Sequence, residues 1–225
     1  ERMQAERQPA YPLLYSLPGF RYCDLLLAAA ERAAWRTVLP APAGSGVGGE
    51  SLVEACRAVS QQAAQALKWV TEGKLSLLTI ALDHLSLGRA ALYEAILTAA
   101  DVRCAWSDVE QAVADLRRAG QQQYLPLGLL TRAWLRHRLG ARTGSDSAQA
   151  DLDEAWDIAE RGPMRLFLAD IHLHRARLFH AATPYPWDSP QADLAAARKL
   201  IEQCGYGRRK EELEDAEAAL GCAET

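Results

Sequence analysis

Several patterns that would assign this chain of 225 residues to a common class of proteins are missing from it. Its longest apolar stretch, from about Leu75 to Leu82, is far shorter than the roughly 20 residues that a membrane-spanning helix needs. Its five cysteines form no CxxC pair and are odd in number, which favours reduced thiols in a cytosol over a disulfide framework. We therefore expect a cytoplasmic protein that does not span a membrane.

The composition also lacks a basic balance and a strand pattern. The formal net charge is −4 and the pI is about 5.8, whereas a protein that binds duplex nucleic acid usually carries a basic face. Asparagine is absent, and no run of alternating β-branched residues reaches strand length. Because alanine, leucine, arginine, glutamate and glutamine dominate, the sequence predicts an all-α fold. The acidic net charge predicts that the protein does not bind nucleic acid.

A six-residue pattern, Leu-x-Arg-Ala-x-Leu, occurs at 87–92, 130–135 and 173–178. Each occurrence follows the previous one by 43 residues. A fixed period between about 20 and 50 residues is typical of stacked repeat units, whose extended surfaces usually bind other molecules.

Each occurrence lies in a predicted helix A, and each helix A precedes a predicted helix B. The A helices are expected at 75–100, 125–139 and 164–182, and the B helices at 107–119, 147–161 and 189–204. Each B helix ends at a glycine, Gly120, Gly162 or Gly205, which we expect to adopt the left-handed conformation that caps a helix. Ser189 and Pro190 are expected to open the last B helix as N-cap and first helical residue.

We predict one domain over 1–225. It comprises a degenerate unit at 11–73 with helices at 20–36 and 51–72, repeats at 74–120, 121–162 and 163–205, and a capping helix at 206–221. The expected fold is an all-α, right-handed superhelix of stacked antiparallel helix hairpins. Ala90, Ala133 and Ala176 are expected where helices cross closely.

The helix pairs, crossing alanines and repeated leucines resemble tetratricopeptide repeats, although 43 residues exceeds their usual period of about 34. Four segments also resemble the C-terminal helical repeats of bacterial signalling proteins with a NACHT, NB-ARC or TIR-like domain. These segments are 11–25, 82–89, 162–170 and 205–213. The resemblance implies a sensor or scaffold, and the chain lacks the Walker lysine motif needed to hydrolyse nucleotide. Because the first methionine is Met3, we expect the chain to be part of a longer protein.

Three repeated arginines, Arg89, Arg132 and Arg175, are the sharpest candidates for a binding site. Along successive A helices they could line a groove and grip the carboxylates of a peptide. Alternatively, each arginine pairs within its own repeat, for example with Glu110 or Asp153, and the repeated position serves packing.

Two further positions could bind ligands. Asp170 and His174 share a helix face and could contribute to a metal site, but the sequence names no third ligand, which favours a structural histidine–aspartate hydrogen bond. Trp187 follows prolines in a loop and could be an exposed anchor for a partner.

Other short patterns favour structural roles. The glycines at 44, 46 and 49 match a dinucleotide-binding fingerprint, but the preceding Pro-Ala-Pro run favours a linker. Cys104 and Cys204 are expected to be buried thiols, and the basic cluster 208–210 is expected on the surface at a helix start.

These observations favour a non-catalytic module that binds a protein or peptide, without metal or cofactor. One alternative is a sensor that binds a small ligand in a pocket between repeats. The other is a metal-dependent helical hydrolase that uses Asp170 and His174.

Overall fold

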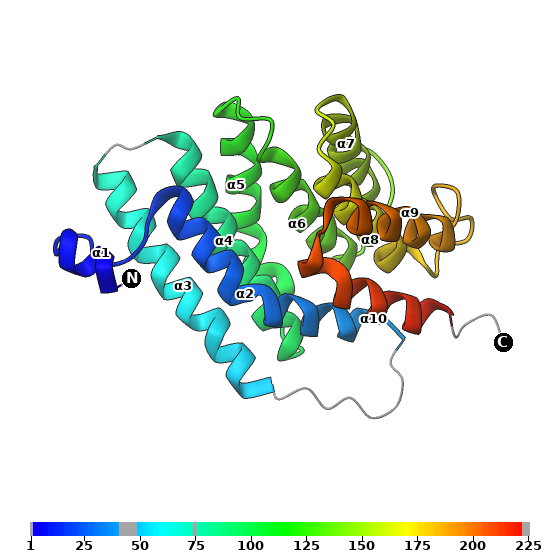
Figure 1. The fold of residues 1–225 in the computed structure, drawn as a ribbon, viewed down its shortest axis with the longest axis horizontal. Helices are drawn as coiled ribbons and strands as arrows, with labels where there is room; N and C mark the ends of the chain where they lie inside the picture. The colour runs from blue at the N-terminus through cyan, green and yellow to red at the C-terminus, as the bar shows by residue number, and fades with distance from the viewer. Residues whose placement is uncertain (1, 41–48, 74–75, 222–225) are drawn as a thin grey trace. The chain divides into compact units, whose positions relative to one another are not determined.

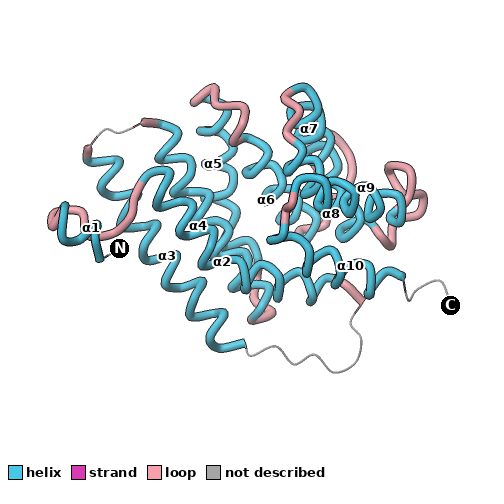
Figure 2. The backbone as a smooth tube through the Cα atoms, viewed as in Figure 1, coloured by secondary structure: helices cyan, strands magenta, loops and turns pink. Residues whose placement is uncertain are grey.

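In the computed structural model, which describes residues 2–40, 49–73 and 76–221, every regular element of that part of the chain is a helix (Figures 1 and 2). The all-α prediction is therefore confirmed. The α-helices are α1 (Arg2–Arg7), α2 (Ser16–Val38), α3 (Gly49–Glu72), α4 (Leu77–Leu97), α5 (Trp106–Arg118), α6 (Leu125–Arg138), α7 (Ala148–Arg161), α8 (Arg165–Phe179), α9 (Pro190–Cys204) and α10 (Lys210–Gly221). Two short 3-10 helices, η1 (Val102–Ala105) and η2 (Gly207–Arg209), precede α5 and α10. Among the described helices, none combines the length and apolar character that crossing a bilayer would require.

The chain divides into two compact units. The first contains the described residues of Glu1–Glu31 and Gly48–Gln121, and the second contains those of Arg32–Val47 and Gln122–Thr225. The boundary at Gln121 falls next to the predicted start of the second repeat at 121. The single repeat domain and its right-handed superhelix stay predictions.

Helix hairpins build both units. In the first unit α4 packs against α3 and α5, and in the second α6 packs against α7, α8 against α9, and α9 against α10. The predicted A helices correspond to α4, α6 and α8, and the predicted B helices to α5, α7 and α9. The helices of the degenerate unit and the cap are also present, as α2, α3 and η2 with α10.

Polar caps define several helix starts. The side chains of Ser76, Ser147 and Ser189 accept hydrogen bonds from backbone N–H groups in the first turns of α4, α7 and α9. Ser189 and Pro190 therefore form the predicted start of α9. Each serine satisfies a backbone donor that the helix itself leaves unpaired.

Two of the three predicted glycine caps have the expected backbone. Gly120 has a φ of 65° and Gly205 a φ of 62°, in the left-handed region. The prediction was wrong for Gly162, whose φ is −93°. There the N–H of Met164 donates to the carbonyl of Ala159 at 2.8 Å, which satisfies the helix end without a left-handed glycine.

The small residues that recur in the A and B helices are buried. Ala90, Ala133 and Ala176 are fully buried, as are Ala112, Ala155 and Ala197 of the B helices. α4 and α5 approach each other closely at Gly88 of α4, where an added Cβ would lie 2.6 Å from Cγ2 and 3.1 Å from the backbone nitrogen of Val109 in α5. A side chain at this position would push the two helices apart.

The expectation for the cysteines was wrong at both named positions. Cys104 is exposed and Cys204 is partly exposed, whereas the buried thiols among the described residues are Cys23 and Cys56. Cys104 lies in η1 near the surface, where its helix-forming neighbours do not cover it. Most of the glycine-rich pattern at 44–49 lies outside the described residues.

Candidate functional site

The first repeated arginine, Arg89 of α4, is buried among acidic side chains of α2. Its guanidinium donates to Asp24 at 2.6 Å and to Glu31 at 3.1 Å, and its Nε donates to the hydroxyl of Tyr93 at 3.1 Å. Only 6% of Arg89 is exposed. Its contacts link α4 to α2 within the first unit, and they do not involve the predicted partner Glu110.

The second repeated arginine, Arg132 of α6, pairs with helix B of its own repeat. Its Nε and Nη2 donate to the carboxylate of Asp151 in α7, at distances down to 2.7 Å. Arg136 donates to the same carboxylate at 3.1 Å. Burial raises the pKa of Asp151, and the two arginines act against this rise. The pair orders the α6–α7 hairpin, as the structural interpretation of the repeat expects.

The third repeated arginine, Arg175 of α8, lies between two indole rings. Its guanidinium carbon is 4.5 Å from the ring centroid of Trp156 and 4.5 Å from that of Trp187. It also donates to Asp153 at 3.4 Å, which belongs to the preceding repeat rather than its own. Cation–π contacts and a carboxylate therefore hold this buried charge.

Trp187 is not the exposed anchor that its proline-rich loop suggested. It is half-buried, and its indole N–H donates to Asp153 at 2.9 Å. Its ring also packs edge-to-face against Phe179, with centroids 5.2 Å apart. These contacts turn the side chain inward onto α8.

Asp170 and His174 share one turn of α8, but the contacts of their side chains differ. A ring nitrogen of His174 bonds to the backbone carbonyl of Asp170 at 2.8 Å, while the Asp170 carboxylate accepts from Arg209 at 2.7 Å and Tyr206 at 3.2 Å. Arg209 is thus buried, whereas Arg208 and Lys210 are exposed at the helix start, so the expectation that the cluster 208–210 lies on the surface was wrong for Arg209 alone. No group of three or more histidine, cysteine, aspartate or glutamate side chains suited to a metal ion occurs among the described residues.

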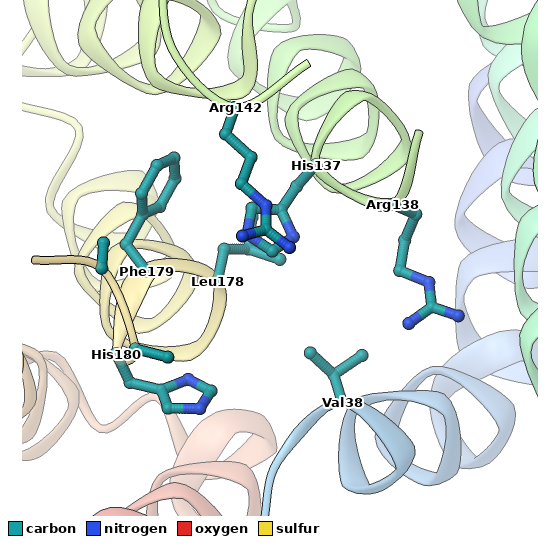
Figure 3. Close-up of a pocket in the computed structure, with 9 residues that line it drawn as sticks. Val38, His137, Arg138, Arg142, Leu178, Phe179 and His180 are labelled. Carbon is teal, nitrogen blue, oxygen red and sulfur yellow. The ribbon is translucent and has the colours of Figure 1, made fainter. Parts of the chain in front are cut away.

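A cavity of about 260 Å³ in the second unit presents a different set of side chains (Figure 3). It lies between the ends of two successive A helices, α6 and α8, beside the end of α2. Its described lining consists of Val38, His137, Arg138, Arg142, Leu178, Phe179, His180, Ala181 and Ala182. We refer to it as the cationic pocket, because two guanidinium groups and two imidazoles line it and none of its described lining residues is a carboxylate.

Backbone contacts position the polar side chains of the cationic pocket. His137 and Arg138 form the last residues of α6. In the loop that follows, the N–H of Arg142 donates to Gly140 at 3.0 Å, and its carbonyl accepts from Gln149 of α7 at 3.1 Å. Arg142 therefore extends into the pocket from an anchored segment of backbone (Figure 3).

The opposite wall comes from the end of α8. Nδ1 of His180 lies 2.9 Å from the carbonyl oxygen of Arg177, so it carries a hydrogen and donates to that oxygen. Phe179 packs edge-to-face on His137, with centroids 5.3 Å apart. These contacts limit the motion of both imidazoles.

No carboxylate in the described part of the chain forms an ion pair with the two arginines of the pocket, Arg138 and Arg142. Burial is the main reason that the pKa of His137 falls to about 4, and the charges of Arg142, Arg138 and His180 lower it further. A hydrogen bond with the backbone of Leu178 acts in the opposite direction. The pocket therefore disfavours added positive charge and would favour an anion.

A second cavity, of about 310 Å³, has a different balance of charge. It lies between α9 and α10, and its charged lining contains both signs. Arg198 and Lys210 lie there with Glu202 and Glu214, and Arg198 bonds to Glu202 at 3.5 Å. This cavity has no comparable preference for an anion.

Sequence reasoning did not single out the cationic pocket, but its signal was present. His137 and His180 are separated by 43 residues, the same interval that separates the repeated arginines. They therefore occupy equivalent positions at the ends of successive A helices. The first repeat carries Glu94 at this position, which pairs with Arg57 at 2.7 Å.

Comparison with known proteins does not assign the chain to a family. No protein-family model matches the chain, and neither a curated protein nor a solved structure matches it.

Proposed function

We propose that the chain is a non-catalytic module that binds a protein or peptide by an anionic group, which enters the cationic pocket. One observation carries this proposal. Arg138 and Arg142 line a cavity, and neither forms an ion pair with a carboxylate in the described part of the chain. Guanidinium groups bind carboxylate and phosphate oxygens through charge-assisted hydrogen bonds.

The proposed architecture is the right-handed, tetratricopeptide-like superhelix predicted from the 43-residue repeat. The packed hairpins α4–α5, α6–α7 and α8–α9 support it. In this arrangement successive A helices form one binding face, and the cationic pocket lies between the A helices α6 and α8. The resemblance to bacterial signalling proteins supports a sensor or scaffold role within a larger cytoplasmic protein.

The repeated arginines no longer belong to the proposed binding face. Arg89, Arg132 and Arg175 are each less than a tenth exposed, and each contacts a carboxylate of this chain. A peptide could reach them only by displacing these internal contacts. We therefore place the proposed binding site at the ends of α6 and α8 rather than at the repeated arginines.

Binding of matched peptides tests this function. A peptide panel would carry phosphoserine, glutamate or glutamine at one fixed position, and retention would be compared between the wild type and the double variant Arg138→Gln/Arg142→Gln. We expect the anionic peptides to bind better than the glutamine peptides, and the double variant to lose this preference. Arg165→Gln is the matched control, because Arg165 is an exposed arginine at the start of α8.

Equal retention of the anionic peptides by wild type and double variant would show that the pocket is not the binding site. Circular dichroism and thermal melting of both variants establish that any loss does not arise from unfolding.

A second candidate function is a sensor of small molecules. The size of the cationic pocket favours it, since about 260 Å³ is close to the lower end of the volumes of small-molecule sites. Binding of an anionic small molecule with no gain from an attached peptide would favour this alternative.

A further inference from the structure

The cationic pocket contains hydrogen-bond acceptors as well as positively charged donors. Guanidinium groups only donate, so Arg138 and Arg142 require acceptor oxygens. His180 donates from Nδ1 to the carbonyl of Arg177, so in the neutral ring Nε2 is an acceptor. His137 likewise has one acceptor ring nitrogen when neutral.

We propose that the cationic pocket binds a phosphate monoester that retains one hydrogen, and this inference rests on the function proposed above. Arg138 and Arg142 donate to the anionic oxygens of the phosphate. A neutral ring nitrogen of His137 or His180 accepts the hydrogen of the remaining P–O–H group. The proton stays between phosphate and imidazole, and no covalent bond changes.

The combination of donors and acceptors separates this ligand from other anions. A carboxylate at neutral pH has only acceptor oxygens, and so has sulfate. A phosphate monoester loses its second proton only near pH 6, so it can present acceptors and one donor together. An imidazole that faces a sulfate oxygen instead must take up a proton, which the neighbouring guanidinium charges oppose.

The surroundings of His137 explain why it keeps its acceptor. The charged and titratable groups that face it are Arg138 from α6, Arg142 from the following loop and His180 from the segment after α8. Phe179 covers its ring. A ligand that brings its own hydrogen therefore suits the pocket better than one that requires imidazolium.

Another explanation for the same residues is that cations simply stabilise the C-terminal ends of α6 and α8. That role would lower stability when the charges are removed. It would favour sulfate near pH 6, because a cluster that acts by charge alone prefers the ion with the larger charge. The two explanations therefore predict opposite orders for phosphate and sulfate.

The experiment compares glycerol phosphate, a phosphate monoester, with sulfate by isothermal titration calorimetry at about pH 6 and about pH 8, on either side of the second ionisation of a phosphate monoester. We expect phosphate to bind at least about tenfold more tightly than sulfate near pH 6, because sulfate lacks the hydrogen that the imidazole accepts. The ratio should fall near pH 8. Sulfate binding as tightly as phosphate near pH 6 would overturn the proposal.

Variants identify the residues. Arg142→Gln should weaken both anions, while Arg165→Gln should weaken neither. His180→Phe and His137→Phe test the acceptors: one of them should bring the phosphate-to-sulfate ratio close to one, with the melting temperature used to verify folding. If both variants fold and keep the wild-type ratio, the imidazoles do not accept the hydrogen. The wild-type ratio itself needs no variant and remains decisive if neither variant folds.

The peptide panel separates this inference from the proposed function. Glutamate and phosphoserine peptides binding equally, with both lost in the arginine double variant, would leave the function standing and refute the phosphate specificity. Loss of all anion binding would refute both. If the phosphoserine peptide binds more tightly than glycerol phosphate, the natural source of the phosphate group is a phosphorylated protein. If the two bind equally, the source is a small phosphate ester.

Discussion

Two arginines in α6 have opposite surroundings. Arg132 is 5% exposed and donates repeatedly to Asp151, whereas Arg138, at the end of the helix, is exposed and forms no ion pair in the described part of the chain. A charge removed from water must be paired to be tolerated, so a buried arginine indicates an internal role. An unpaired arginine on the wall of a cavity remains available to a ligand.

The largest expected effect comes from breaking the buried pair. Arg132→Ala should lower the free energy of unfolding by about 3–5 kcal/mol, because it removes the main partner of a buried carboxylate. Chemical denaturation at constant m-value measures this change. Unchanged stability combined with lost peptide binding would instead return Arg132 to a binding role.

A buried carboxylate without an arginine sharpens the comparison. Asp83 of α4 is 3% exposed, and its Oδ2 has no hydrogen-bond partner among the described residues. Burial raises its pKa from 3.8 to about 7. The folded chain therefore binds more protons than the unfolded chain between these values, and this group lowers stability as the pH rises from about 4 to 7.

Asp83→Asn should consequently stabilise the protein by about 1–3 kcal/mol above pH 7, because it removes the cost of an ionisable group at a site that disfavours charge. The gain should vanish near pH 4, where Asp83 is neutral. Urea denaturation at both pH values measures it. Asp146→Asn is the control, because the Asp146 side chain is 90% exposed, and an equal gain there would contradict this explanation.

The alanine beside Arg132 tests packing without touching the ion pair. Ala133 is fully buried, so Ala133→Leu should overpack the helix contact and lower the free energy of unfolding by about 1–3 kcal/mol. The melting temperature reports the effect. Ala195→Leu makes the same change at an exposed position of α9, and similar melting temperatures for the two variants would mean that Ala133 is not tightly packed.

The smallest effect on stability is expected at the cationic pocket. Arg142→Gln should change the free energy of unfolding by less than about 0.5 kcal/mol at neutral pH, as is usual for an exposed residue without a structural contact. Its measurable effect is on His137, whose pKa should rise from about 4 because one of the charges that lower it is lost. Histidine NMR titration measures this shift, and an unchanged pKa would show that Arg142 does not act on His137.

The imidazole of His137 also makes the stability of the protein depend on pH. The pKa of His137 is lower in the folded chain than the ordinary 6.5, so the unfolded chain binds more protons between 6.5 and about 4. This contribution to stability is complete above pH 6.5 and is lost as the pH falls through 4. In Arg142→Gln the loss should be smaller.

Local patterns predicted most of the helices because their signals lie within the helices themselves. The expected range 125–139 became α6 (Leu125–Arg138), and 147–161 became α7 (Ala148–Arg161). The wrong details depended on three-dimensional surroundings. Trp187 turned inward because Asp153 and Phe179 lie beside it, and no local pattern in the loop indicates either contact.

The site was less predictable than the fold for the same reason. Arg89 pairs with Asp24 and Glu31, which are 65 and 58 residues away in the sequence. The repeat could indicate that three arginines are equivalent, but it could not show which acidic residues reach them. For His137 and His180 the interval of 43 residues did carry the information, and only the cavity reveals its use.

The stacked indoles of Trp35 and Trp134 provide an optical consequence of the core. Their ring centroids are 3.6 Å apart and their planes differ by 13°, and each side chain is 1% exposed. Two such chromophores couple electronically, so the second unit should contribute an exciton couplet to the far-ultraviolet circular dichroism in addition to its helical signal. Because the couplet requires the last turns of α2 to rest on α6, it distinguishes a packed second unit from one whose helices have formed but not yet assembled.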